Sequence, residues 1–293
     1  MSKRRLVVIY NPFSGKNKGR DLPPLIQQYI DHSQFDVQVW PTEKPEDLHY
    51  LTEKAIQENF EIVVAAGGDG TINQIASRLI NTTVSLGIIP LGSGNGFARH
   101  FKLPMNTIKA IQNLGLQKEK LIDTVWLDRH CMINIGGFGF DAQISAAFAG
   151  NKKRGLKGYI KTILKHLNYK AQAYKLYKDK TLIWEGEAFM IGIANATQWG
   201  NNVYLYPGAK PDDGLFNVLV VKAFSGLDFF KIVGNLLQRR LHMNEHTELF
   251  TGTDFEIVRQ AAGPVHVDGE PLWLDKKVDI RIEPLSLRIL QNE

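Results

Sequence analysis

The stretch Ile62–Asn73, IVVAAGGDGTIN, decides the fold of the first half of the chain. A β-branched apolar run leads into glycines and then into a polar helix start, the order of a strand, a tight turn and a helix. Glycines let backbone N–H groups approach an anion, and the helix N-terminus adds partial positive charge. The stretch therefore predicts a phosphate-binding turn. It matches neither a Walker A loop nor a dinucleotide-binding Gly-x-Gly-x-x-Gly.

Before Asp123, short apolar runs alternate with segments of helical periodicity. The runs are Leu6–Tyr10, Val37–Trp40, Ile62–Ala66 and Val84–Ile89. Within Pro45–Asn59, apolar residues at positions 48, 51, 55 and 56 fall on one helical face. This alternation predicts an α/β domain with a doubly wound, mostly parallel sheet and crossover helices.

After Asp123 the pattern changes to apolar runs separated by turn residues. The runs are Val125–Leu127, Met132–Ile135, Thr181–Trp184, Met190–Ala194, Phe216–Val221, Glu256–Arg259, Val265–Val267 and Val278–Ile282. Strands without regular intervening helices predict an antiparallel sandwich or barrel. Two helices are expected to interrupt it, Lys153–Leu167 and a second that runs from an N-cap at Ser225 to about Leu241.

Composition sets broad limits on the class of protein. The 293 residues are 44% hydrophobic and 22% charged, with a net charge of +5 that suits contact with anionic lipid or nucleotide. No run approaches the ~18 apolar residues of a membrane span, and the N-terminal apolar run is too short for a signal peptide. We therefore expect a cytoplasmic protein. Cys131 is the one cysteine, which excludes an internal disulfide and is expected to be a packed thiol.

Two further glycine-containing turns follow predicted strands. Pro90–Phe97, PLGSGNGF, comes after the strand at 84–89, and Asn11–Lys16, NPFSGK, comes after the first strand. Carboxyl ends of adjacent parallel strands open onto one crevice, so these turns and the one at 67–70 are expected to face one ligand. Together they predict a nucleotide crevice.

Four motifs, in this order, resemble the bacterial diacylglycerol kinase and lipid kinase family, which is related to sphingosine and ceramide kinases. They are Asn11-Pro12 with Ser14-Gly15, Gly67–Asn73, Pro90–Asn95 and Val267–Glu270. The resemblance spans nearly the whole chain. It implies a β-sandwich second domain and a final strand, Leu285–Leu290, that returns to the first domain. The expected domains are residues 1–124 with 284–293, and residues 125–283.

The resemblance implies that ATP binds in the first domain and that Glu270 is the catalytic base. The implied ATP contacts are Asn11, Thr42, Gly67, Gly68, Asp69, Gly70, Thr71, Asn73 and Ser93. A hydroxyl nucleophile benefits from a carboxylate that accepts its proton during phosphoryl transfer. Asp268 is two residues from Glu270, on the same face of an extended segment, and remains a rival for that role.

The resemblance also places a structural Mg²⁺ at the loop Lys210–Leu215. Its implied ligands are the side chain of Asp213 and the main-chain carbonyls of Lys210 and Leu215. Mg²⁺ prefers a few oxygen ligands and water. Asp-Asp-Gly is equally a turn tripeptide, so a metal loop and a plain turn are both open. A catalytic Mg²⁺ is expected to arrive with ATP and to touch Asp69.

The loop Ser93–Gly96, SGNG, departs from the Thr-x-Asn-Asp of many bacterial diacylglycerol kinases because it lacks the acidic group. It is closer to the loop of sphingosine kinases, and whether Asp123 replaces the missing acid stays open. We expect diacylglycerol as the acceptor, with phosphatidic acid as the product; a sphingoid base or ceramide is the alternative. An NAD kinase is less consistent with the first and third motifs. A non-catalytic nucleotide-binding regulator is less consistent with the retained Asp69 and Glu270.

A soluble kinase must reach its lipid, and two segments are candidates for membrane contact. Lys153–Leu167 has an apolar face beside lysines that recur every four residues, and Phe224–Leu241 combines apolar residues with Arg239-Arg240. Either pattern suits an interfacial helix or an ordinary docked helix. We expect a lipid substrate presented at a membrane surface, peripheral contact with the inner face of the membrane, and no nucleic acid partner. A homodimer is left open.

Overall fold

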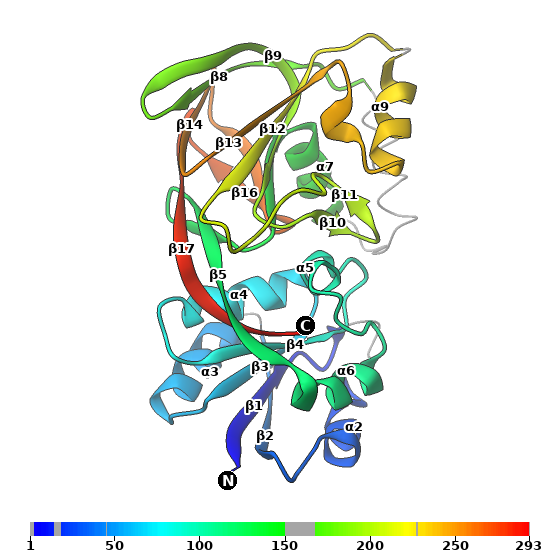
Figure 1. Ribbon diagram of the computed structural model, residues 1–293, viewed down its shortest axis with the longest axis vertical. Coiled ribbons are helices and arrows are strands. Elements are labelled where there is room, and N and C mark those ends of the chain that lie inside the picture. The colour runs from blue at the N-terminus through cyan, green and yellow to red at the C-terminus, as the bar shows by residue number, and fades with distance from the viewer. Residues whose placement is uncertain (1–2, 15–18, 45, 150–167, 227, 293) are drawn as a thin grey trace. The chain divides into compact units, whose positions relative to one another are not determined.

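The computed structural model describes residues 3–14, 19–44, 46–149, 168–226 and 228–292 (Figure 1). The chain forms two compact units, residues 1–122 with 285–293, and residues 123–284. The expected boundaries lay at 124/125 and 283/284. Two long strands, β5 (Lys118–Leu127) and β17 (Lys277–Gln291), each contribute residues to both units.

The first unit contains a parallel sheet in the strand order β17-β4-β3-β1-β2. Its strands are β1 (Arg4–Tyr10), β2 (Phe35–Pro41), β3 (Ile62–Gly67), β4 (Ser85–Pro90) and the end of β17. Neighbouring strands in this order run parallel throughout. The predicted mostly parallel sheet is confirmed. The central strands β3 and β4 are buried along their whole length, as expected of strands with both faces covered.

Helices cover both faces of this sheet. They are α2 (Leu22–Tyr29), α3 (Asp47–Gln57), α4 (Asp69–Leu79), the short α5 (Gly96–His100), α6 (Thr107–Asn113) and the 3-10 turn η1 (Leu114–Leu116). α2 and α6 pack on the face formed by alternate residues such as Leu6 and Val64, whereas α3 and α4 pack against each other and against β1, β3 and β4. α3 confirms the helix expected within 45–59, although Leu51 and Ile56 are only half-buried.

The second unit is an antiparallel β-sandwich, as expected. Its further strands are β6 (His130–Met132), β7 (Ile135–Gly139), β8 (Gln172–Lys178), β9 (Thr181–Ala194), β10 (Gln198–Gly200), β11 (Val203–Tyr204), β12 (Phe216–Lys222), β13 (Thr247–Gly252), β14 (Asp254–Arg259), β15 (Gly263–Val267) and β16 (Glu270–Leu274). They pair in the order β16-β15-β7-β9-β8-β14-β17, and β12 joins β9 to β13. The expected runs 181–184 and 190–194 are parts of one strand, and the run 132–135 divides into β6 and β7.

The helices of the second unit differ from those expected. α7 (Phe140–Ala149) was not predicted, and the expected helix Lys153–Leu167 lies outside the described residues. α9 spans Asp228–Leu237, and a 3-10 turn, η2, spans Leu241–Met243. The predicted continuation to Leu241 is wrong because Arg239 has a φ of 61°, which ends the helix. No helix in the described part of the chain is long and apolar enough to cross a membrane.

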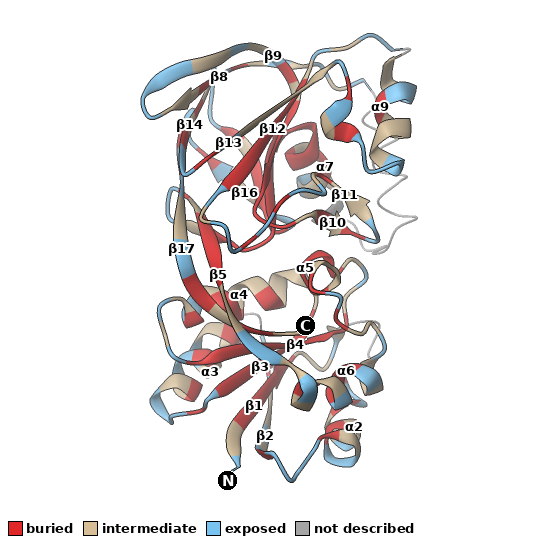
Figure 2. Ribbon diagram, viewed as in Figure 1, coloured by how far each residue is buried: buried red, intermediate tan, exposed pale blue. Residues whose placement is uncertain are grey.

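Buried residues are red in Figure 2, and most of them are apolar and make up the core of each unit. In the second unit, one core cluster joins alternate residues of β7, β8, β9, β12 and β14, including Phe138, Ile191 and Phe216. Cys131 is buried, and burial raises the pKa of its thiol well above the ordinary value. The expectation of a packed thiol is therefore confirmed.

Candidate active site

The carboxyl ends of β1 to β4 lie at one edge of the parallel sheet. In the strand register Tyr10 pairs with Pro41 and with Ala66, and Gly67 pairs with Pro90. The turns that follow these strands therefore open at the same edge. β1 lies between β2 and β3, so the connections that leave β1 and β3 run to opposite sides. Open α/β sheets bind ligands at such a switch point, outside the carboxyl ends of the strands.

The two glycine-rich turns after β3 and β4 are packed against each other. The N–H groups of Leu91 and Gly92 donate to the Gly67 carbonyl at 2.8 and 3.2 Å. A Cβ atom on Gly92 would lie 2.6 Å from the Gly68 Cα atom, and one on Gly67 would lie 2.5 Å from the Thr71 side chain. Neither position has room for a side chain. Gly67 and Gly92 are therefore required by the packing of the two turns, whether or not a ligand is bound.

The second turn also holds the start of α4. The Asp69 carboxylate, at the first residue of α4, accepts a hydrogen bond from the Phe97 N–H at 3.4 Å. Asn95 adopts a left-handed conformation and its Nδ2 donates to the Gly92 carbonyl at 2.8 Å. The Oδ1 atom of Asn95 is buried and has no hydrogen-bond partner among the described residues. Ser93, between these groups, is exposed.

The turns after β1 and β2 complete this edge. The Asn11 side-chain oxygen accepts a hydrogen bond from the Phe13 N–H at 2.8 Å. The Asn11 main-chain carbonyl accepts one from the Ser14 hydroxyl at 2.9 Å. Thr42 is buried, and its N–H donates to the Tyr10 carbonyl at 2.9 Å. Asn11 therefore shapes its own turn, and Thr42 extends the pairing of β1 and β2 by one residue.

The structure places most of the predicted nucleotide ligands at this one edge. They are Asn11, Thr42, Gly67, Gly68, Asp69, Gly70, Thr71 and Ser93. Asn73 lies one turn further along α4 and is half-buried. The start of a helix, here of α4, is a favourable place for an anion because its first N–H groups have no acceptors within the helix.

Glu270 and Asp268 belong to a tight hairpin of the second unit. Asp268 and Gly269 have φ values of 50° and 87°, as in the two-residue turns that join antiparallel strands. The Asp268 carboxylate is buried and accepts three amide N–H groups from Ile133–Ile135, each at 2.9 Å. Glu270, the first residue of β16, is exposed. This arrangement gives Asp268 a structural role and leaves Glu270 as the candidate base.

The loop Lys210–Leu215, the candidate Mg²⁺ site, is held within the second unit by hydrogen bonds with Asp123. The Gly214 N–H donates to the Asp123 carboxylate at 2.8 Å, and the Asp123 N–H donates to the Pro211 carbonyl at 2.6 Å. The Leu215 N–H donates to the Asp213 carboxylate at 3.1 Å. Gly214 has a φ of 73°, so the loop uses a left-handed residue to turn.

The donor set of this loop fits Mg²⁺. Asp213 is exposed, and the backbone carbonyls of Lys210 and Leu215 lie in the same short loop. The buried Asp123 supplies a second carboxylate against the loop backbone. Carboxylate and carbonyl oxygens are the ligands that Mg²⁺ prefers. The loop is thus a folded turn whose oxygens are chemically suited to the metal that the family resemblance implies.

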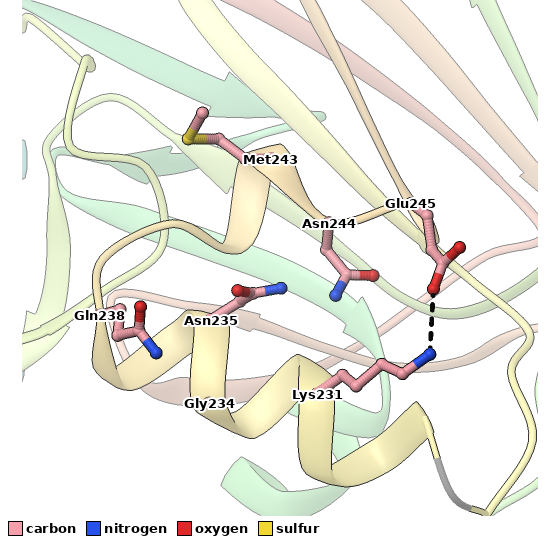
Figure 3. A pocket seen from close by; sticks show the side chains of 7 residues that line it. All are labelled: Lys231, Gly234, Asn235, Gln238, Met243, Asn244 and Glu245. Carbon is pink, nitrogen blue, oxygen red and sulfur yellow. Dashed lines mark hydrogen bonds and ion pairs between the residues drawn. The ribbon is translucent and has the colours of Figure 1, made fainter.

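Another acidic group lies beside α9. Ligand atoms of Asp228, Glu245 and His246 lie within 4.8 Å of one another. The Lys231 ammonium already contacts the Asp228 carboxylate at 3.1 Å and that of Glu245 at 3.3 Å. Figure 3 shows Lys231 reaching from α9 to Glu245. A lysine therefore supplies the positive charge here, and we assign no metal to this group.

A buried histidine and carboxylate were missed by the sequence analysis. His266 of β15 places Nε2 at 2.6 Å from Oδ2 of Asp141, the second residue of α7, and only 1% of His266 is exposed. Trp199 Nε1 donates to the same carboxylate oxygen at 2.9 Å. Burial alone would lower the pKa of His266, but the charge and hydrogen bond of Asp141 raise it above the ordinary value.

Comparison with known proteins finds two family models that match consecutive parts of the chain. The family described as "Diacylglycerol kinase catalytic domain" matches residues 5–127. The "YegS C-terminal NAD kinase beta sandwich-like domain" matches residues 135–291. The chain belongs to the diacylglycerol kinase and YegS-like lipid kinase family.

Two relatives and one solved structure illustrate the likeness. The lipid kinase is 31% identical to a Chromohalobacter salexigens protein named "Probable lipid kinase YegS-like", over 76% of this chain and 74% of the relative. It is 29% identical to a Staphylococcus saprophyticus diacylglycerol kinase, over 75% and 73%. A Bacillus anthracis diacylglycerol kinase crystal structure has a TM-score of 0.76 at 20% identity, over 99% and 97% of the two chains, and supports the fold.

The sequence of this lipid kinase contained a signal for most of the site but none for the histidine pair. Glycine-rich turns after strands and an Asp-Gly-Glu hairpin are local patterns. Asp141 and His266 are far apart in sequence, and Asp141 belongs to a helix that the periodicity did not reveal. A buried hydrogen bond between residues so far apart in sequence is visible only once the strands and helices are assembled.

Proposed function

We propose that this lipid kinase transfers the γ-phosphoryl group of ATP to the hydroxyl of diacylglycerol and yields phosphatidic acid and ADP. The observation that carries the proposal is the interlocked pair of glycine turns at the carboxyl edge of the parallel sheet, around Gly67 and Gly92. Family membership supports a lipid acceptor, and a relative named diacylglycerol kinase supports the choice of acceptor.

The nucleotide phosphates bind at the start of α4, where Gly68 to Thr71 present backbone N–H groups and the helix dipole favours negative charge. Asp69 is half-buried at the same helix start. Asp69 is the carboxylate that would hold a Mg²⁺ arriving with ATP, and that ion would supply charge neutralisation on the phosphate oxygens. Asp213, with the main-chain carbonyls of Lys210 and Leu215, would hold a second, structural Mg²⁺.

Glu270 accepts the proton of the lipid hydroxyl. As the hydroxyl oxygen forms a bond to the γ-phosphorus, the bond from that phosphorus to the bridging oxygen breaks, and ADP leaves with the bridging oxygen. Glu270 is exposed at the start of β16, whereas the Asp268 carboxylate is already engaged with three amides. Glu270 can therefore approach a substrate, whereas Asp268 would first have to break its bonds to these amides.

A sphingoid base or ceramide is the second candidate acceptor. The loop around Ser93 favours it, because that loop lacks the acidic residue of many diacylglycerol kinases and exposes a serine instead. The lipid kinase should be incubated with radiolabelled ATP and diacylglycerol, monoacylglycerol, sphinganine, ceramide or NAD. The proposal predicts label in phosphatidic acid. Label in a sphingoid phosphate or in NADP would replace diacylglycerol as the substrate, and no label in any product would contradict a kinase.

We further propose that α9 and η2 contact an anionic membrane surface. Three large apolar side chains in this segment are highly exposed: Phe230 at 73%, Leu237 at 74% and Met243 at 70%. Phe230 and Leu237 are seven residues apart, so they share the side of α9 opposite the buried Ile232. Apolar residues on a helix lower the free energy of peripheral binding when they enter the headgroup region.

Cations border this apolar side. The Arg239 guanidinium stacks on the Tyr204 ring at 4.2 Å, and Arg240 is exposed beside it. The carboxylates of Asp228 and Glu245 are matched by Lys231 on the neighbouring side of α9, where the groove of Figure 3 lies. The two arginines that follow α9 are therefore the cations of this segment that favour anionic lipid.

A further inference from the structure

The turn that precedes Glu270 is held through both backbone polar groups of Gly269. The Gly269 N–H donates to Nδ1 of His266 at 3.3 Å, and the other ring nitrogen contacts Asp141 at 2.6 Å. The Gly269 carbonyl accepts from the Ser145 hydroxyl at 2.7 Å. Asp141 and Ser145 lie one turn apart on the same side of α7. One helix thus reaches the turn at its donor and at its acceptor.

The imidazole is fixed in orientation. Because Nδ1 of His266 accepts from Gly269, the proton of the neutral ring lies on Nε2 and is donated to Asp141. A Cβ atom on Gly137 would lie 2.9 Å from the Asp141 carboxylate and 3.0 Å from Nε2 of His266. The histidine and the carboxylate therefore occupy the space that a side chain at 137 would need. In this one orientation both ring nitrogens of His266 have hydrogen-bond partners.

A buried polar network of this kind is costly unless every member is satisfied. This one is satisfied, and it ends at the residue before the candidate base. We propose that Asp141, His266 and Ser145 are positioning residues that hold the Glu270 carboxylate in place for proton transfer. The inference rests on the proposed function, because it assigns the network a role through Glu270.

Two substitutions of His266 separate positioning from stability. Asparagine places an oxygen near the Nδ1 position, so His266→Asn keeps an acceptor for the Gly269 N–H but cannot reach Asp141. Glutamine reaches the Nε2 position, so His266→Gln keeps the contact with Asp141 but leaves the Gly269 N–H without its acceptor. Ser145→Ala is a milder change that removes only the bond to the Gly269 carbonyl.

We expect kcat to fall about 10- to 100-fold in His266→Gln and Ser145→Ala, because small misplacements of a reacting group cost rates of that order. KM for ATP should not change, since the predicted nucleotide contacts lie in the first unit. His266→Asn should keep more activity than His266→Gln. Its stability should fall further, because the buried Asp141 carboxylate loses the hydrogen bond from His266 and keeps only the one from Trp199. Of the two variants, His266→Asn should thus have the higher kcat and His266→Gln the higher unfolding temperature.

Thr251→Val is the matched control for Ser145→Ala. The Thr251 hydroxyl donates to the Asn217 side chain at 2.9 Å in the same unit, away from the turn, so this variant should lose stability without losing kcat. Full kcat in Ser145→Ala, or kcat that follows unfolding temperature across the His266 pair, would overturn the inference. If Glu270→Gln kept full kcat, the base and its positioning would both be overturned. If the wild type phosphorylated no lipid, the proposed function itself would fail.

Discussion

At the scale of single residues, Asp268 and Glu270 show how one motif can contain two different roles. Both are acids in Val-Asp-Gly-Glu, and the sequence leaves them as rivals for the base. The structure separates them because the amides of Ile133–Ile135 come from another part of the chain and surround only Asp268. A contact between residues more than 130 positions apart leaves no local pattern.

Asp268→Asn should therefore destabilise the protein. The new amide would direct an N–H group at amide donors and leave at least one buried N–H without an acceptor, which costs about 1–3 kcal/mol. Glu270→Gln, at an exposed position, should change the free energy of unfolding by less than about 0.5 kcal/mol. Urea unfolding of both variants measures the difference. An Asp268→Asn variant that is as stable as the wild type but inactive would instead make Asp268 the base.

At the scale of helices and strands, sequence patterns were reliable where periodicity was local and strong. The parallel strands and α3 appear within a few residues of their expected positions. α7 was missed because its residues are mostly small or apolar, so that no polar side marks it as a helix. α9 is shorter than expected at both ends. It ends before the left-handed Arg239, and it begins at Asp228, three residues after Ser225, whose hydroxyl donates to the Asp228 carboxylate.

α9 also carries the membrane prediction. The double substitution Phe230→Ala with Leu237→Ala should reduce binding to phosphatidylglycerol-containing vesicles at least about tenfold, because each side chain loses apolar area that would enter the lipid. Vesicle cosedimentation measures the effect. Leu182→Ala, which removes another exposed apolar side chain of the second unit, is the control and should bind normally. Unchanged binding of the double variant would exclude α9 as the contact.

At the scale of the whole molecule, the order of the motifs predicted more than any one of them. Gly-Gly-Asp-Gly-Thr alone left several kinase families open, whereas the later loop and the hairpin at 268–270 indicated one. The two-unit organisation followed from the change of pattern near Asp123, which β5 crosses. The network around His266 could not be predicted, because it depends on packing between a helix and a hairpin that lie far apart in sequence.

The central claim is that the glycine turns of the first unit bind ATP and that Glu270 of the second unit accepts the hydroxyl proton. The most direct measurement is the single-turnover rate of phosphoryl transfer to diacylglycerol in Glu270→Gln, together with its affinity for ATP. Glu185→Gln, an exposed carboxylate in the same unit that pairs with Lys175, is the control. We predict normal ATP affinity and a rate at least about 100-fold lower, as general bases contribute. A Glu270→Gln variant that transfers at the wild-type rate would contradict the account.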